Sequence, residues 1–200
     1  MVILGLTGSI AMGKSATAQM FRRLGVPVHD SDAEVHNLMA RGGAAVAAVE
    51  AAFPGVVKNG AVDRAALGQR VFGRPDELQK LEAILHPLVG KSREQFRRRH
   101  IARGTPVVVY DIPLLYEVGA DALCDEVVVV SAPKFLQRQR VLRRPGMSAE
   151  RLKSILARQM PDADKRRRAD FVVPTGLGKA ETLRHIKQIV ALANFMVGRH

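Results

Sequence analysis

A glycine-rich segment close to the first residue constrains the fold of this chain more than any other feature. Residues 5–16 are GLTGSIAMGKSA, and they match the spacing G-x-x-x-x-G-K-S/T at Gly8, Gly13, Lys14 and Ser15. The apolar run at 2–6 predicts a short buried strand before this loop, and the apolar spacing over 15–24 predicts a helix after it. A strand, a glycine loop and a helix in this order form the context of a phosphate-binding loop.

Such a loop binds phosphates mainly through its backbone. Successive N–H groups and the positive end of the following helix converge on the phosphate oxygens, and glycine permits their close approach. Lys14 would reach the β- and γ-phosphates as a point charge. The Ser15 hydroxyl would ligate a Mg²⁺ ion that bridges the same oxygens. The segment therefore predicts a protein that binds a nucleoside triphosphate together with Mg²⁺.

Four further apolar runs predict the remaining strands, at 26–29, 106–111, 126–131 and 171–173. Helix-like sequence separates each run from the next, which is typical of buried parallel strands. An amphipathic pattern over 179–197 predicts a closing helix. We expect one α/β domain over 1–200, with a three-layer P-loop NTPase fold and a five-stranded parallel sheet.

Two long helical stretches interrupt this alternation of strands and helices. Residues 32–104 form the first, and we interpret them as a helical substrate-binding insertion that caps a cleft. Residues 133–168 form the second, which is dense in arginine and turns at 145–148, where Ser148 is suited to cap the next helix. We interpret 133–168 as a mobile helical lid.

The charge of the chain indicates a strongly anionic partner. Lysine and arginine number 31 against 19 acidic residues, a formal net charge of +12, which suits nucleic acid, a membrane surface or a polyphosphorylated small molecule. Aromatic residues make up only 4% of the chain, and the basic runs at 97–100 and 165–168 contain none, so a base-stacking surface is not favoured. We expect no specific nucleic-acid partner.

The expected location is the cytoplasm. No apolar run predicts a signal peptide or a membrane span, so we expect no membrane partner. The single cysteine, Cys124, is expected to be a buried structural thiol, and a chain with one cysteine fits a reducing compartment.

Acidic residues follow two predicted strands, at the sheet edge where ligands bind in open parallel sheets. Asp30 and Asp32 follow the second strand, and one of them is expected to orient an acceptor hydroxyl first and to take its proton second. Spacing alone does not choose between the two. The alternative is that both aspartates act only as helix caps. Asp111 ends the third strand, where a carboxylate holds the water shell of Mg²⁺ in a P-loop enzyme.

Three basic side chains complete the set of candidates. Arg140 and Arg144 are four residues apart in QRQRVLRR, which predicts that both guanidinium groups lie on one helix face and close over transferring phosphates. A solvated helix face is the alternative for this pair. His86 in LHPLV is, by pattern alone, a histidine at a helix end or in packing.

Six segments together resemble the dephospho-CoA kinase family in order and spacing. They are LGLTGSIAMGKS, GVPVHDSDAEVH, LHPLV, VYDIPLLYE, QRQRVLRR with SAERLKSILARQ, and ADFVV. The loop alone would define only a P-loop NTPase, whereas DSDAEVH and DIPLLYE are much more specific to this family. The resemblance covers nearly the whole chain. It implies an alcohol-group phosphotransferase that phosphorylates the ribose 3′-hydroxyl of dephospho-CoA with ATP, the last step of coenzyme A synthesis.

The resemblance also implies residue roles and the partners ATP and dephospho-CoA. It makes 32–104 the CoA-side insertion, places the acceptor-side aspartate on Asp32, and adds His86 and Asp111 to the substrate-binding residues. The expected catalytic residues are Lys14, Asp32 and Arg140. The expected ATP contacts are Gly8, Ser9, Ala11, Met12, Gly13, Lys14, Ser15, Ala16 and Arg144. Mg²⁺ is the expected cofactor, held by Ser15 and, through water, by Asp111.

Three positions depart from the pattern of the family. Ala16 stands where a second hydroxyl residue is common, so one α-phosphate hydrogen bond of about 1 kcal/mol is lost and a raised KM for ATP is expected. Pro174 and Thr175 stand where an asparagine is usual, which bears on the adenine contacts. Pro145 replaces a usual acidic residue at the lid turn.

Two rival functions remain open from the residues themselves. One is another small-acceptor kinase of the same fold, acting on a nucleoside, a nucleotide or a shikimate-like alcohol. The other is a nucleic-acid-binding P-loop ATPase, which the basic charge favours and the lack of interleaved aromatic residues opposes. A panel of acceptors distinguishes the first rival, and stimulation of ATP turnover by nucleic acid distinguishes the second.

Overall fold

The chain divides into two units in a computed structural model that describes residues 1–198. The first unit joins Met1–His29 to the chain from Ile101 onward, and the second is Asp30–His100. Among the described residues, no helix has the length and apolar character needed to cross a membrane.

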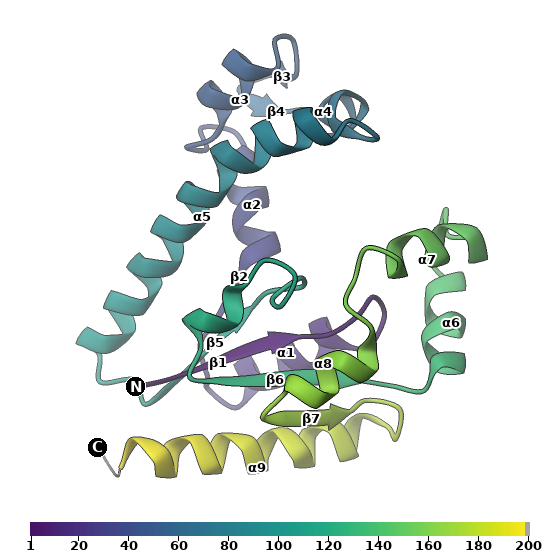
Figure 1. Ribbon diagram of the computed structural model, residues 1–200. Helices are drawn as coiled ribbons and strands as arrows, with labels where there is room; N and C mark the ends of the chain where they lie inside the picture. The colour runs from purple at the N-terminus through teal and green to yellow at the C-terminus, as the bar shows by residue number, and fades with distance from the viewer. Residues whose placement is uncertain (199–200) are drawn as a thin grey trace. The chain divides into compact units, whose positions relative to one another are not determined.

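The first unit contains a five-stranded sheet in the order β2-β5-β1-β6-β7 (Figure 1). The strands are β1 (Val2–Thr7), β2 (Val28–Asp30), β5 (Val107–Asp111), β6 (Glu126–Ser131) and β7 (Phe171–Pro174). β1 is parallel to both β5 and β6, and β6 is parallel to β7. The predicted five-stranded parallel sheet is confirmed. The second strand begins at Val28 rather than at residue 26, because Pro27 has no N–H to give to a ladder.

Both faces of this sheet are buried, which explains the continuous valine runs of β5 and β6. On one face, alternate strand residues such as Leu4 and Val109 pack with α1 (Lys14–Arg23) and α9 (Lys179–Val197). On the other, Val108 and Val129 are buried outside that cluster, and α8 (Asp162–Arg168) packs against β6. The predicted three-layer α/β fold is confirmed.

Three helices span the segment predicted as a lid: α6 (Lys134–Leu142), α7 (Ala149–Leu156) and α8. Ser148 caps α7, as predicted, and its Oγ accepts a hydrogen bond of 3.2 Å from the backbone N–H of Arg151. α6 ends at Leu142, so Arg144 lies outside the helix and the prediction that Arg140 and Arg144 share one helix face is wrong. The cause is Pro145, because proline disfavours the helical conformation in the residue before it.

The second unit is mostly helical, with α2 (Ser31–Met39), α3 (Val46–Ala52), α4 (Arg64–Val71) and most of α5 (Pro75–Ala102). It also contains an antiparallel hairpin of β3 (Val57–Lys58) and β4 (Ala61–Val62), which the sequence analysis missed. Asn59 and Gly60 turn this hairpin with φ of 52° and 77°, the conformation that an Asn-Gly pair favours. The unit buries its own apolar cluster around Val49, Phe53 and Leu67.

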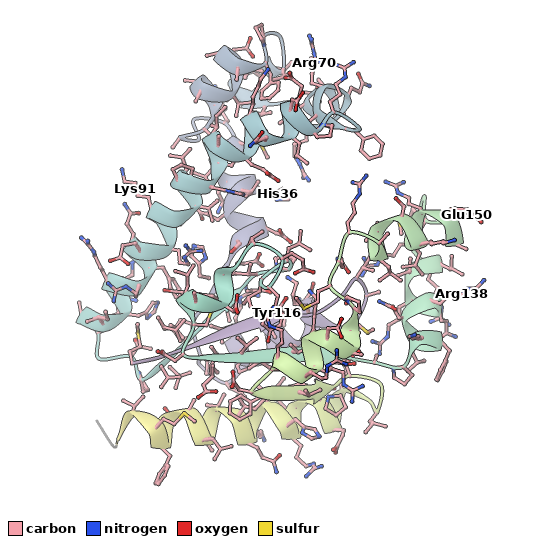
Figure 2. The ribbon with its side chains drawn as sticks, viewed as in Figure 1. His36, Arg70, Lys91, Tyr116, Arg138 and Glu150 are labelled. Carbon is pink, nitrogen blue, oxygen red and sulfur yellow. The ribbon has the colours of Figure 1, made fainter. Side chains whose placement is uncertain are left out.

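Between Lys134 and Leu156, α6 and α7 lie beside each other, and Figure 2 shows Arg138 and Glu150 on these neighbouring helices. The 3₁₀ helix η1 (Ala120–Leu123) follows the segment after β5. Cys124 comes directly after η1 and is half-buried rather than buried, with its Sγ 3.7 Å from the carbonyl oxygen of Ala120.

Candidate active site

The phosphate-binding loop joins the end of β1 at Thr7 to the start of α1 at Lys14. Gly13 adopts φ of 98°, and a Cβ there would lie 3.0 Å from Oγ1 of Thr175. A Cβ on Gly8 would lie 2.4 Å from Cγ2 of Val130. Both glycines of the motif are therefore required by the packing of this chain, before any ligand is considered.

The start of α1 leaves the positive end of the helix uncompensated by the protein. Within the described chain, no side chain caps α1, and its first turn holds no acidic residue. Ser15 and Ala16 are exposed in that first turn. A helix start of this kind attracts an anion, because its N–H groups and its dipole both favour negative charge.

Lys14 and Asp111, 97 residues apart in the chain, form an ion pair at the edge of the sheet. Nζ of Lys14 lies 2.8 Å from Oδ1 of Asp111, and the two side chains are 16% and 2% exposed. Strand pairing brings them together, because β1 and β5 are adjacent and parallel, so that their carboxyl ends meet at one edge. The loop lysine and the strand-end aspartate therefore lie in one site.

Arg140 links the lid segment to the phosphate-binding loop and to the loop after β7. From α6, its Nη2 donates to the backbone oxygen of Thr175 at 2.8 Å, and its Nη1 lies 3.4 Å from the carbonyl oxygen of Ala11. Oγ1 of Thr175 in turn donates to the carbonyl oxygen of Met12 at 2.6 Å. Thr175 therefore fastens the loop after β7 to the phosphate-binding loop.

The remaining basic candidates lie apart from these contacts. Arg144 is exposed beyond the end of α6. His86 is exposed in the interior of α5, directly before Pro87, so the prediction of a helix-end or packing histidine is wrong. Pro87 does not end the helix: α5 continues past it to Ala102, so His86 lies well inside the helix rather than at its end.

The two aspartates after β2 differ in their contacts. Oδ1 of Asp30 accepts a hydrogen bond of 3.0 Å from the backbone N–H of Ala33 and so caps α2. The carboxylate of Asp32 is exposed in the first turn of α2, while its backbone oxygen lies 2.8 Å from Nδ1 of His36. Figure 2 shows His36 on this helix. Asp30 is therefore the cap of α2, and this distinguishes two aspartates between which spacing did not choose.

A buried ion pair lies beside the site, and the sequence analysis missed it. Nζ of Lys165, which is fully buried in α8, lies 2.9 Å from Oε1 of Glu117, and the same oxygen accepts the N–H of Met160 at 2.8 Å. Burial alone would raise the pKa of Glu117, but these two donors outweigh it and hold that pKa below its ordinary value. The basic run at 165–168 is therefore not a uniformly solvated face.

Tyr116, next to Glu117 in the segment after β5, is buried, and Figure 2 labels it. The guanidinium carbon of Arg168 lies 4.4 Å from the centre of its ring, and Arg168 also pairs with Asp121 at 2.9 Å. Burial raises the pKa of Tyr116 to about 12. Tyr116 is therefore neutral across the physiological range, and its contact with Arg168 fastens α8 to this segment.

A cavity of about 980 Å³ lies beside the phosphate-binding loop, among α6, α7, α8 and the end of β7. Its walls are largely apolar and include Met12, Leu136, Leu156, Pro161 and Leu177. Neither Lys14 nor Asp111 lines it. The helices of the lid segment therefore enclose space that is not part of the ion-pair site.

The fold and the loop define the class of this protein: it is a nucleotide-binding protein of the P-loop type. The family model described as dephospho-CoA kinase matches residues 2–178. A dephospho-CoA kinase from Paramagnetospirillum magneticum is 62% identical over 192 residues, which cover 96% of this chain and 91% of that protein. The chain therefore belongs to the dephospho-CoA kinase family, and the resemblance of the six segments is confirmed.

Solved structures agree with this assignment of the fold. The crystal structure of TT1252 from Thermus thermophilus has a TM-score of 0.80 and 34% identity, covering 96% of both chains. The dephospho-CoA kinase from Campylobacter jejuni has a TM-score of 0.64 and 22% identity, again covering 96% of both chains. The second likeness supports the fold alone.

Proposed function

We propose that this chain transfers the γ-phosphoryl group of ATP to the ribose 3′-hydroxyl of dephospho-CoA, giving CoA and ADP. The observation that carries the proposal is the Lys14–Asp111 pair at an intact phosphate-binding loop, in a chain of the dephospho-CoA kinase family. Its two anionic substrates also account for part of the net charge of +12.

The donor side of the site is built from backbone and cations. The N–H groups of the loop and the start of α1 would hold the β-phosphate, with Ser9, Met12 and Ala16 among the contacts. Lys14 would exchange its contact with Asp111 for the phosphate oxygens and stabilise the charge that spreads over them in the transition state. Arg140 lies within reach of the same loop, through Ala11.

The residues at the loop fit a Mg²⁺ ion. Among residues 1–198, no group of three or more histidine, cysteine and acidic side chains is arranged to hold a metal. Mg²⁺ in nucleotide sites needs no such group, because it keeps several waters and phosphate oxygens beside one or two protein oxygens. The Ser15 hydroxyl and, through water, the Asp111 carboxylate would supply these oxygens. When bound, the ion neutralises charge on the β- and γ-phosphates.

On the acceptor side, we assign Asp32 to the 3′-hydroxyl. Its carboxylate is exposed, whereas that of Asp30 is used as a helix cap. Positioning the hydroxyl matters more than removing its proton, because phosphoryl transfer has a loose transition state. We place residues 32–104 on the CoA side of the enzyme, with His86 as a further substrate contact.

We assign residues 133–168 to a lid that excludes water while the phosphoryl group is transferred. The cavity among α6, α7 and α8 supports this proposal, because it gives α6 and α7 room to move relative to α8, which is held by β6 and Glu117. Arg144, beyond the end of α6, would reach ATP only when the lid closes. The cytoplasmic location stays a prediction.

An acceptor panel tests the proposal. The purified protein is incubated with Mg²⁺-ATP and dephospho-CoA, adenosine, AMP, shikimate or DNA, and ADP release is recorded for each. We expect release with dephospho-CoA alone. Release with shikimate or a nucleotide would identify the rival small-acceptor kinase, and release stimulated by DNA would identify the nucleic-acid-dependent ATPase.

A further inference from the structure

Both backbone polar groups of one residue in the phosphate-binding loop are held by glutamine side chains. The N–H of Ile10 donates to Oε1 of Gln159 at 3.1 Å. The carbonyl oxygen of Ile10 accepts from Nε2 of Gln137 at 2.9 Å. Ile10 is the second of the four residues between the two motif glycines, so the contacts fall in the middle of the loop.

The two glutamines flank the pair of helices α6 and α7 in the lid segment. Gln137 lies in the first turn of α6 and is 5% exposed, and Gln159 follows the end of α7. They are 127 and 149 residues from Ile10 in the chain. The α6–α7 part of the segment that we propose as the lid is therefore attached on both sides to the same residue of the loop.

The second attachment lies in a firmly held stretch of chain. Directly after Gln159, the N–H of Met160 donates to Glu117, and Lys165 pairs with the same carboxylate. Oδ2 of Asp162 accepts a hydrogen bond of 2.8 Å from Oγ of Ser131 at the end of β6. These contacts fix the base of the lid segment, so Gln159 approaches Ile10 from a rigid support.

The contact with Gln137 sets the direction of a neighbouring donor. In a planar trans peptide the N–H points away from the C=O, so holding the Ile10 carbonyl toward Gln137 turns the Ala11 N–H to the opposite side. Ala11 has φ of 59°, a left-handed conformation that is costly for a residue other than glycine. Such a conformation persists only where the surroundings hold it, and the contacts of the two glutamines with Ile10 and of Arg140 with the Ala11 carbonyl oxygen surround it.

We propose that Gln137 and Gln159 are positioning residues that clamp Ile10, keep the Ala11 N–H directed at the phosphates, and couple the shape of the loop to both sides of the α6–α7 pair. This inference rests on the proposed function, because it concerns the ATP side of that site. The two glutamines have different tasks: Gln159 accepts a hydrogen bond and Gln137 donates one.

The kinetic test uses Gln137→Leu and Gln159→Leu, which keep the size of the side chain and remove its hydrogen bonding. Gln139→Leu, two residues along α6 and exposed, is the matched control. We expect each clamp variant to raise the KM for ATP and the calorimetric Kd for ATP about tenfold, the effect of one hydrogen bond. The KM for dephospho-CoA should change less than about twofold, and the control should match the unaltered protein.

A second test depends on which group donates. A carboxylate accepts hydrogen bonds but does not donate them at neutral pH. Gln159→Glu should therefore keep the amide hydrogen exchange of Ile10 slow, while Gln159→Leu accelerates it. Gln137→Glu should raise the KM for ATP at least as much as Gln137→Leu does.

The proposal is overturned if neither leucine variant changes ATP affinity, or if Gln159→Leu leaves the exchange of Ile10 slow. It is equally overturned if both variants only lower the melting temperature and the active fraction, since that result assigns a purely structural role. Failure of the proposed function is separate: the unaltered protein would then not phosphorylate dephospho-CoA. The ATP Kd and the Ile10 exchange involve no acceptor and still decide on the clamp.

Discussion

The phosphate-binding loop is held in shape by contacts between residues far apart in the chain, whereas the unit of residues 30–100 has many contacts between residues close together in the chain. Side chains that fix the loop come from far along the chain: Lys14 meets Asp111 across 97 residues, and Thr175 reaches Met12 across 163. In the second unit, many side-chain contacts are local. Asp30 caps α2 by accepting a hydrogen bond from the N–H of Ala33, three residues along the chain, and Glu50 accepts from the N–H groups of residues 55 and 57.

The difference separates what tertiary structure builds from what local sequence builds. A loop fixed from four distant segments forms only when the sheet has formed, because each contact needs two strands or helices in place. A unit held by caps and short turns has its local structure encoded nearby. The predictions below test this contrast, beginning with the largest expected effect.

Breaking the ion pair at the loop should affect turnover and stability together. Lys14→Met removes the cation that stabilises the transition state, and we expect kcat to fall about 10³-fold. It also leaves the carboxylate of Asp111, 2% exposed, without its cation, so the free energy of unfolding should fall by about 3 kcal/mol. Steady-state kinetics and urea unfolding measure the two effects.

The double variant Lys14→Met/Asp111→Asn separates these effects. Removing both charges should restore most of the lost stability while kcat stays low. A double variant that recovers turnover would show that Lys14 acts only as the partner of Asp111.

In the second unit, neighbouring aspartates should differ in their effect on catalysis. Asp32→Asn should lower kcat about 10²-fold, because a carboxylate that orients and deprotonates the acceptor is lost, while the calorimetric Kd for ATP stays unchanged. Asp30→Asn is the matched control, since asparagine caps a helix as well as aspartate does. Equal losses of kcat in both variants would remove the distinction between cap and acceptor contact.

The Glu117–Lys165 pair should make part of the stability dependent on pH. The pKa of Glu117 is held below its ordinary value of 4.5, so its contribution is fully present above about pH 4.5 and is lost as the pH falls through the lower, folded-state pKa. Glu117→Gln should therefore have a lower melting temperature than the unaltered protein at pH 7, and this difference in melting temperature should narrow as the pH falls below about 4.5. A gap that stays constant with pH would contradict this contribution.

The smallest effect is expected at Thr175. Thr175→Val keeps the shape but removes the hydroxyl that donates to Met12, so the free energy of unfolding should fall by about 1–2 kcal/mol and the KM for ATP should rise a few-fold. Thr175→Ser keeps the hydroxyl and should resemble the unaltered protein in KM. If the valine and serine variants have the same KM, the hydroxyl does not shape the loop.

The sequence predicted the parts of the molecule that local pattern determines. The five strands, the loop between β1 and α1, the cap at Ser148 and the place of Asp111 at a strand end all follow from apolar periodicity and from a few turn or capping residues. The family followed from the motifs taken together rather than from the loop alone.

The rest required tertiary structure. Nothing in QRQRVLRR or in ILARQ reveals that Gln137 and Gln159 meet at Ile10, because each contact joins chain segments more than a hundred residues apart. The basic run at 165–168 does not reveal that Lys165 is buried, because its burial comes from the packing of α8 against β6. Two local signals held more than was inferred from them. The Asn59-Gly60 pair predicts the hairpin, and Pro145, which was assigned to the lid turn, also ends the helix before Arg144.

The Lys14 site is expected to transfer a phosphoryl group to the 3′-hydroxyl of dephospho-CoA. Tandem mass spectrometry of the acceptor after incubation with Mg²⁺-ATP measures this transfer, with Lys14→Met compared against the unaltered protein. We expect a gain of one phosphoryl group on the ribose 3′-oxygen with the unaltered protein and almost none with the variant. A product phosphorylated elsewhere, or equal product from both proteins, would overturn the proposed function.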